Sequence, residues 1–93
     1  MILIVAYDLH NPGRSYGPIA KLLKTATGGW AHPQGSVWLI DTTSTPTWWR
    51  DNLDDVADAN DEFFVMRVYK NWAASASFDD DVVDWLKSSS RNW

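Results

Sequence analysis

The first apolar segment of the chain ends on an acid. Residues 2–6 form an unbroken apolar run that continues through Tyr7 to Asp8. A run of this length predicts a buried strand. Residues 9–15 indicate a turn and the start of a helix, so we expect Asp8 at the carboxyl end of the strand, where functional sites collect.

A helix is predicted after this turn. Ser15 is expected to cap it, and Pro18 suits its first turn. Apolar residues then recur at helical spacing, namely Ile19, Leu22, Leu23 and Ala26. Gly28 and Gly29 predict the end of this helix.

The middle of the chain predicts strands followed by a second helix. Residues 30–32, a break at 33–35 and residues 36–41 fit either two short strands joined by a turn or one bulged strand. Ser44 or Thr45 followed by Pro46 predicts a helix start. The apolar face of that helix is expected to contain Trp49, Leu53, Val56 and Ala57, and Asn60–Asp61 marks the exit.

The last predicted elements are a strand over residues 63–69 and a helix after Asp79–Asp81, whose acids suit a helix N-terminus. The element order is therefore βαββαβ plus a C-terminal helix. This order predicts an α+β fold, a ferredoxin-like split βαβ sandwich with both helices of the repeat on one sheet face. We expect one domain over residues 1–93, with a core at 1–70 and an extension at 71–93.

The apolar residues on the second face of the predicted sheet must be shielded from water. Residues 2–5 and 63–66 are apolar on both alternating faces, whereas two helices cover only one. Leaving several large side chains in water costs several kcal/mol at about 25 cal/mol per Å² of apolar surface. We expect a homodimer packed sheet to sheet, in preference to coverage by the C-terminal helix.

Charge and composition limit the function classes. The net charge is −4, and the eight Lys and Arg residues are scattered along the chain, so the sequence shows no basic patch for a bare nucleic-acid binder. Cysteine is absent, so disulfides do not stabilise the fold. No segment reaches the ~20 apolar residues of a membrane-spanning helix. We therefore expect a soluble, cytoplasmic protein.

The turn after the first strand holds the candidate chemistry. Asp8 is placed to meet a metal ion or a phosphate ester, although an aspartate there also suits a cap of the turn. His10, two residues on, is a candidate ligand or proton donor, or else a surface loop histidine. Arg14 can grip a phosphate or stabilise developing negative charge, and the alternative is a solvated arginine.

Several short segments in a fixed order resemble one family. They are Tyr7-Asp8-Leu9 ending a strand, Arg14 just beyond, Ser36-Val37-Trp38 opening a middle strand, and Asn60-Asp61-Glu62 before a final apolar strand. Over about residues 1–70 the chain resembles the Cas two family of small dimeric CRISPR-associated subunits. The wider superfamily includes VapD-type toxins and SinR-like proteins, and the chain is most similar to the SinR-like branch.

The resemblance implies a ferredoxin-like homodimer in which Asp8 meets its symmetry mate and holds a divalent ion. Two facing carboxylates repel unless a cation intervenes, and Mg²⁺ is satisfied by one or two carboxylates with waters and phosphate oxygens. Ser36 matches the family's serine at the middle strand. The implied activity is a Mg²⁺-dependent endonuclease on RNA or DNA. A non-catalytic dimeric adaptor that binds a protein remains open as the alternative. An RNA binder on the open sheet would need exposed aromatic residues on the two central strands, whereas the first strand offers Ile, Leu and Val.

Overall fold

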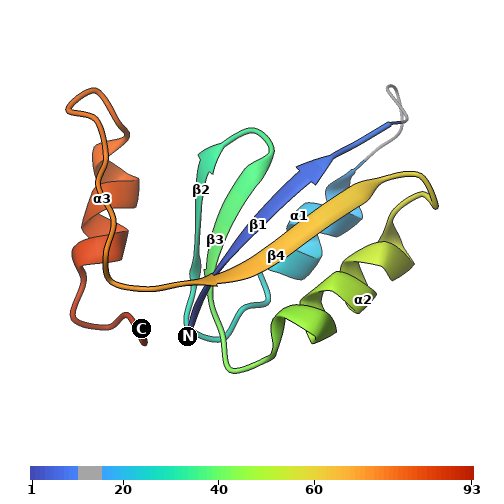
Figure 1. Cartoon of the computed structure of the whole chain (residues 1–93), viewed down its shortest axis with the longest axis horizontal. Coiled ribbons are helices and arrows are strands. Elements are labelled where there is room, and N and C mark those ends of the chain that lie inside the picture. The colour runs from blue at the N-terminus through green and yellow to red at the C-terminus, as the bar shows by residue number, and fades with distance from the viewer. Residues whose placement is uncertain (11–15) are drawn as a thin grey trace.

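The computed structural model describes residues 1–10 and 16–93, and these residues form four strands and three helices (Figure 1). The elements in chain order are β1 (Ile2–Asp8), α1 (Gly17–Leu23), β2 (Trp30–Gln34), β3 (Val37–Asp41), α2 (Pro46–Val56), β4 (Glu62–Val68) and α3 (Asp80–Lys87). The α+β class predicted from the sequence is confirmed, and Asp8 ends β1 as expected.

The strands form one antiparallel sheet in the order β2-β3-β1-β4. β1 is central, and its Ala6 pairs with Val37 of β3 on one side and with Phe64 of β4 on the other. β2 and β3 are two separate strands, and their register shifts between Ala31 and Gln34. The two-strand alternative is therefore correct, with an irregularity around Pro33, which has no N–H to donate.

The first helix is shorter than predicted. α1 begins after Tyr16, which occupies the N-cap position and makes no side-chain capping bond there, and it ends at Leu23. The predicted capping residue Ser15 lies outside the described residues. Ala26 was expected inside this helix, but it follows the helix end and is nevertheless buried. An apolar residue in the turn extended the helical pattern beyond the helix itself.

The other two helices begin at polar caps. The Thr45 hydroxyl accepts the backbone N–H of Trp48 at 3.1 Å, and a side-chain oxygen of Asp79 accepts that of Asp81 at 2.8 Å. Both bonds satisfy amides that a helix start leaves free. None of the helices in residues 1–10 and 16–93 has the length and apolar character needed to cross a bilayer.

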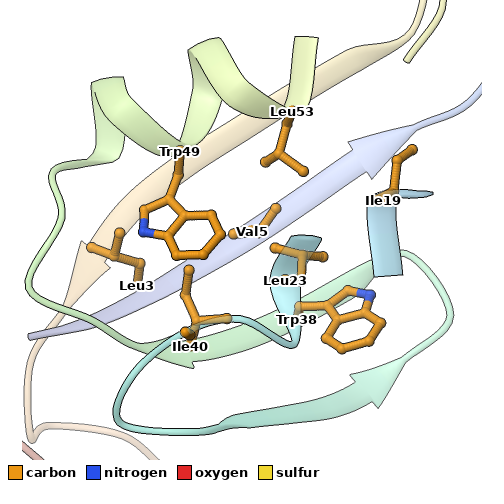
Figure 2. Packing of buried hydrophobic residues seen from close by; sticks show 9 residues of the cluster. Leu3, Val5, Ile19, Leu23, Trp38, Ile40, Trp49 and Leu53 are labelled. Atoms are coloured by element: carbon orange, nitrogen blue, oxygen red, sulfur yellow. The ribbon is translucent and has the colours of Figure 1, made fainter. Parts of the chain in front are cut away.

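The main core lies between the sheet and the two helices α1 and α2 (Figure 2). Leu3 and Val5 point from β1 toward this side, and Trp49 and Leu53 of α2 meet them there. The predicted apolar face of α2 is therefore confirmed for Trp49, Leu53 and Val56, whereas the helix ends at Val56, before Ala57 and the predicted exit at Asn60–Asp61. Trp38 of β3 is also 2% exposed, so the core is closed by indole rings as well as aliphatic chains.

The second face of the sheet is covered only in part. A smaller cluster joins Ala31 of β2 to Val82 and Leu86 of α3. The C-terminal residues thus cover the side of β2 and β3, as expected for the alternative to a homodimer. On the β4 side, Phe64 and Met66 remain 60% and 50% exposed. We call the residues Ala6, Phe64 and Met66 the open apolar strip.

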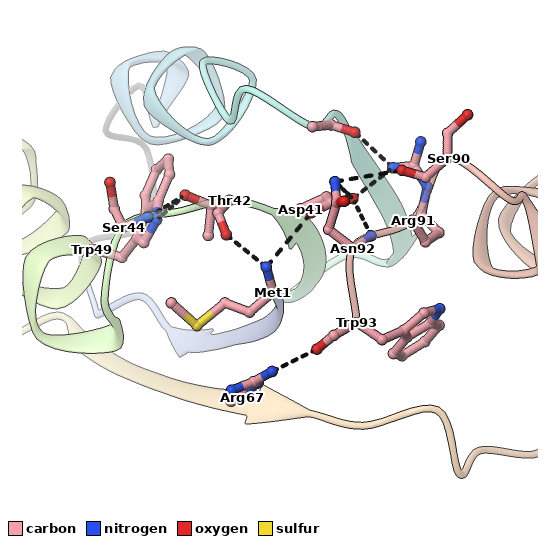
Figure 3. Close-up of polar contacts among 11 residues, drawn as sticks. Met1, Asp41, Thr42, Ser44, Trp49, Arg67, Ser90, Arg91, Asn92 and Trp93 are labelled. Atoms are coloured by element: carbon pink, nitrogen blue, oxygen red, sulfur yellow. Dashed lines mark hydrogen bonds and ion pairs between the residues drawn. The ribbon is translucent and has the colours of Figure 1, made fainter.

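A buried carboxylate attaches the C-terminal residues to the sheet (Figure 3). Asp41, 1% exposed, accepts the backbone N–H of Asn92 at 3.0 Å and lies 3.7 Å from the guanidinium of Arg91. The nitrogen of Met1 lies 3.8 Å from the same carboxylate. Arg91 also donates to the carbonyl of Gly28 at 2.7 Å. Buried charges need such partners, so this network fixes the path of residues 91–92.

Candidate functional site

Asp8 lies at the end of β1, directly opposite Glu62, the first residue of β4. The two side chains alternate onto the same face as Ala6 and Phe64, and each is 76% exposed. Like charges in directly opposite positions of an antiparallel pair are destabilising. The pairing of β1 with β4 therefore places two acids where a cation would be favourable.

His10 lies between these two acids. Its Nε2 is 3.5 Å from Oδ2 of Asp8 and 3.3 Å from Oε1 of Glu62. The imidazole ring is 40% exposed, so solvent reaches it. The structure thus brings together Asp8 and His10, which the sequence proposed as a pair. The ring is placed to exchange a proton with a ligand bound at the two carboxylates.

Asp61 anchors the backbone beneath this cluster. Its Oδ1 accepts the backbone N–H of His10 at 2.8 Å, and its Oδ2 accepts that of Asp58 at 3.0 Å. The bond from the His10 N–H is the main reason that the pKa of Asp61 lies below its ordinary value, and burial opposes this shift. Asp61 is 7% exposed, and its two hydrogen bonds hold the chain after β1 against the loop before β4.

The remaining predicted site residues are not placed beside Asp8. Ser36 lies in the turn between β2 and β3, and its carbonyl accepts the N–H of Tyr7. The neighbouring pair Ala6 and Val37 belongs to the face of Asp8, so alternation puts the position opposite Tyr7 on the other face. Arg14 lies outside the described residues.

Glu62 and Asp61 are the residues that sequence reasoning missed. The segment Asn60-Asp61-Glu62 contributed to the resemblance, but no role followed from it. Finding Glu62 requires the register of β1 against β4, which pairs the last residue of one strand with the first of the other. An acid at the end of one strand and another at the start of its antiparallel neighbour is a signal that could have been used.

The cluster can hold a hard cation only with additional ligands. Within the described parts of the chain, no three His, Cys, Asp or Glu side chains form a ready metal group. Asp8 and Glu62 nevertheless supply carboxylate oxygens, and Mg²⁺ accepts one or two carboxylates when waters and phosphate oxygens fill the other positions. The residues present therefore fit Mg²⁺ together with a phosphate ligand better than a closed protein cage.

A shallow hollow of about 330 Å³ lies beside the two acids, and its lining includes Ala6, Tyr7 and Phe64. Both carboxylates also line it, so a ligand there would touch the acids and the Ala6 and Phe64 part of the open apolar strip. No protein-family model, curated protein or solved structure matches the chain. The chemistry of the site is therefore inferred from its side chains.

Proposed function

We propose that this chain is a ferredoxin-like, Cas two-type homodimer of the cytoplasm that cleaves phosphodiester bonds in RNA or DNA with Mg²⁺. The element order and the strand order β2-β3-β1-β4 support the fold assignment. The observation that carries the function is the pair of exposed carboxylates, Asp8 and Glu62, facing each other at the end of the open apolar strip.

The homodimer is supported by the uncovered part of the sheet. On β4, Phe64 is 60% exposed and Met66 is 50% exposed, and Phe64 pairs with Ala6 of β1. Burial of this surface at about 25 cal/mol per Å² favours association. A two-fold axis near Ala6 would pack the strip against itself and bring the acids of both copies toward one place.

The proposed chemistry divides between the ion and the chain. A bound Mg²⁺ would polarise the phosphodiester and lower the pKa of a coordinated water. Asp8 and Glu62 would hold it through their carboxylate oxygens. His10, in contact with both, would receive or supply the proton that hydrolysis of the bond requires.

The test is a cleavage assay on end-labelled single-stranded RNA, single-stranded DNA and duplex DNA, with Mg²⁺ or with EDTA. We expect Mg²⁺-dependent cleavage of at least one substrate, and loss of at least a hundredfold in rate in Asp8→Ala and Glu62→Ala. Asp55→Ala, an exposed acid on α2, is the matched control and should cleave normally. Cleavage that persists in Asp8→Ala would remove this site from the mechanism.

The dimer is tested separately by sedimentation equilibrium. We expect a dimer for the wild-type protein and for Asp8→Ala, and a monomer for Phe64→Asp, because a charge in the open apolar strip opposes its burial. Trp48→Asp is the control, since Trp48 is 43% exposed on α2, away from this strip. A monomeric wild-type protein would contradict the proposed assembly.

The second candidate is a dimeric adaptor without catalysis. It is favoured by the acids on the outer side of α2, where Asp51, Asp54 and Asp55 are all exposed. This helix could bind a basic protein through charge complementarity. A dimer that cleaves none of the three substrates, and that binds a basic partner less tightly in Asp54→Asn/Asp55→Asn, would support the adaptor over the nuclease.

A further inference from the structure

A second surface with binding features lies at the opposite edge of the sheet, on β2. Its exposed rings are Trp30, 38% exposed, and His32. His32 stacks on Trp38 with ring centroids 3.9 Å apart and planes at 18°, and Trp30 lies 5.2 Å from the same indole. Trp38 is 2% exposed and belongs to the main core, so both outer rings rest on a fixed base. We call Trp30 and His32 the β2 platform.

Hydrogen bonds hold this platform in place. The indole N–H of Trp38 donates to the hydroxyl of Tyr7 at 3.0 Å, and that hydroxyl donates to the carbonyl of Gly35 at 3.0 Å. Nε2 of His32 lies 3.2 Å from the same carbonyl. The turn between β2 and β3 and the end of β1 are therefore joined to the platform, and the rings are oriented before any ligand arrives.

Cations lie next to the rings. Nζ of Lys24 is 5.0 Å from the ring centroid of Trp30, and Lys21 lies one turn earlier on α1. The sequence around them is free of acids, because residues 9–40 contain no Asp or Glu. The chain has a net charge of −4, and all of its Asp and Glu residues lie outside this part. The fold adds the contact between Lys24 and Trp30, which the sequence does not indicate.

The ligand that suits the platform has flat rings and repeated negative charge. An exposed aromatic face binds a nucleobase by stacking without regard to its identity, and nearby lysines neutralise the backbone phosphates. A duplex keeps its base faces stacked inside the helix, so they are closed to such a platform. We propose that Trp30, His32 and Lys24 form a binding site for single-stranded nucleic acid.

This site lies apart from Asp8, and binding there requires neither a metal ion nor cleavage. Asp8 is on the face of Ala6, whereas Trp30 pairs with Ile40, a residue of the main core on the other face. Binding measured in EDTA can therefore succeed while the proposed nuclease fails, and the reverse is also possible. The two proposals have separate outcomes.

The experiment titrates the protein into a fluorescently labelled oligothymidylate of about 12 nucleotides in EDTA and follows fluorescence anisotropy. Trp30→Ala and His32→Ala should each weaken binding by about tenfold or more, the usual value of one stacked base. Lys24→Gln should weaken it less and reduce the dependence of log K on log salt by about one phosphate contact. Circular dichroism spectra will establish that each variant is folded.

Two matched controls test the location. Trp48→Ala removes an indole of similar exposure from the acidic helix α2, and Lys87→Gln removes a cation from α3. Both should bind like the wild-type protein. Equal weakening in these controls, absence of binding by the wild-type protein, or equal affinity for a hairpin duplex would each overturn the proposal. Undiminished binding by folded Trp30→Ala and His32→Ala would also overturn it, because charge alone would then explain the affinity.

Discussion

The buried carboxylate of Asp41 gives the sharpest test of how the C-terminal residues are held. Asp41→Asn keeps the shape of the side chain but replaces one carboxylate oxygen with an NH₂ group. The amide oxygen, placed where Oδ2 was, can still accept the N–H of Asn92 and face the guanidinium of Arg91, while the NH₂ group must then face the nitrogen of Met1. A donor then meets a donor, and the cations lose their counter-charge.

The expected loss is about 3 kcal/mol, because removing one partner of a buried pair costs about 3–5 kcal/mol and the retained hydrogen bond places this variant at the low end. For a domain of this size, 1 kcal/mol shifts Tm by about 4–8 °C, so Tm should fall by about 12–24 °C. Thermal unfolding followed by circular dichroism at pH 7 measures this. Asp55→Asn, on the exposed side of α2, should stay within about 0.5 kcal/mol of wild type.

A double variant separates the ion pair from the general cost of the substitution. Arg91→Met alone removes one of the positive charges that balance the Asp41 carboxylate. It also removes the contact between the Arg91 guanidinium and the Trp85 ring, whose centroid lies 4.2 Å away. Combining it with Asp41→Asn removes both charges, so the double variant should lose less stability than the sum of the two single variants. A loss below about 1 kcal/mol in Asp41→Asn, or strict additivity, would refute the proposed role of the buried charge.

Further predictions concern close packing, acid stability and helix capping. A Cβ atom at Gly28 would lie 2.5 Å from Cγ of Asp41 and 2.9 Å from its carbonyl oxygen. Gly28→Ala should therefore destabilise the fold by about 1–3 kcal/mol in urea titrations, the usual cost of overpacking. An unchanged unfolding midpoint would contradict this packing. The N–H of His10 holds the pKa of Asp61 below its ordinary value, so Asp61 stabilises the folded state above about pH 4 and this contribution is lost as pH falls further. Asp61→Asn should therefore unfold at lower urea than wild type at pH 7, with a gap that narrows at acidic pH, and a constant gap would be the contrary result. Thr45→Ala should cost about 1 kcal/mol by loss of the α2 cap, with Thr47→Ala, at an exposed position of the same helix, as its control.

The sequence predicted the elements with strong local patterns. β1 followed from its continuous apolar run, and α2 followed from Thr45, Pro46 and an apolar face with helical spacing, all of which act within one or two turns. The end of α1 was predicted too late because Ala26 is buried by the turn it lies in, and burial in a turn has the same sequence signal as burial on a helix.

The cover on the second sheet face could not be predicted because it depends on contacts between distant parts of the chain. Asp41 and Asn92 are 51 residues apart, and nothing near either residue indicates that they meet. The candidate site shows the same limit. Asp8 and His10 were found from their neighbours in sequence, whereas Glu62 joins them only through strand register.

The two borders of the sheet differ in what they can recruit. Pro33 lacks an amide hydrogen, and the register of β2 shifts around it, so this border offers no regular row of donors and acceptors to an incoming strand. β4 pairs with β1 without a break over seven residues, and its far side is the other border. A molecule with only one edge strand that can pair with another chain can form a dimer through that edge, but the dimer has no second such edge. Growth into fibres by edge pairing therefore stops at two chains.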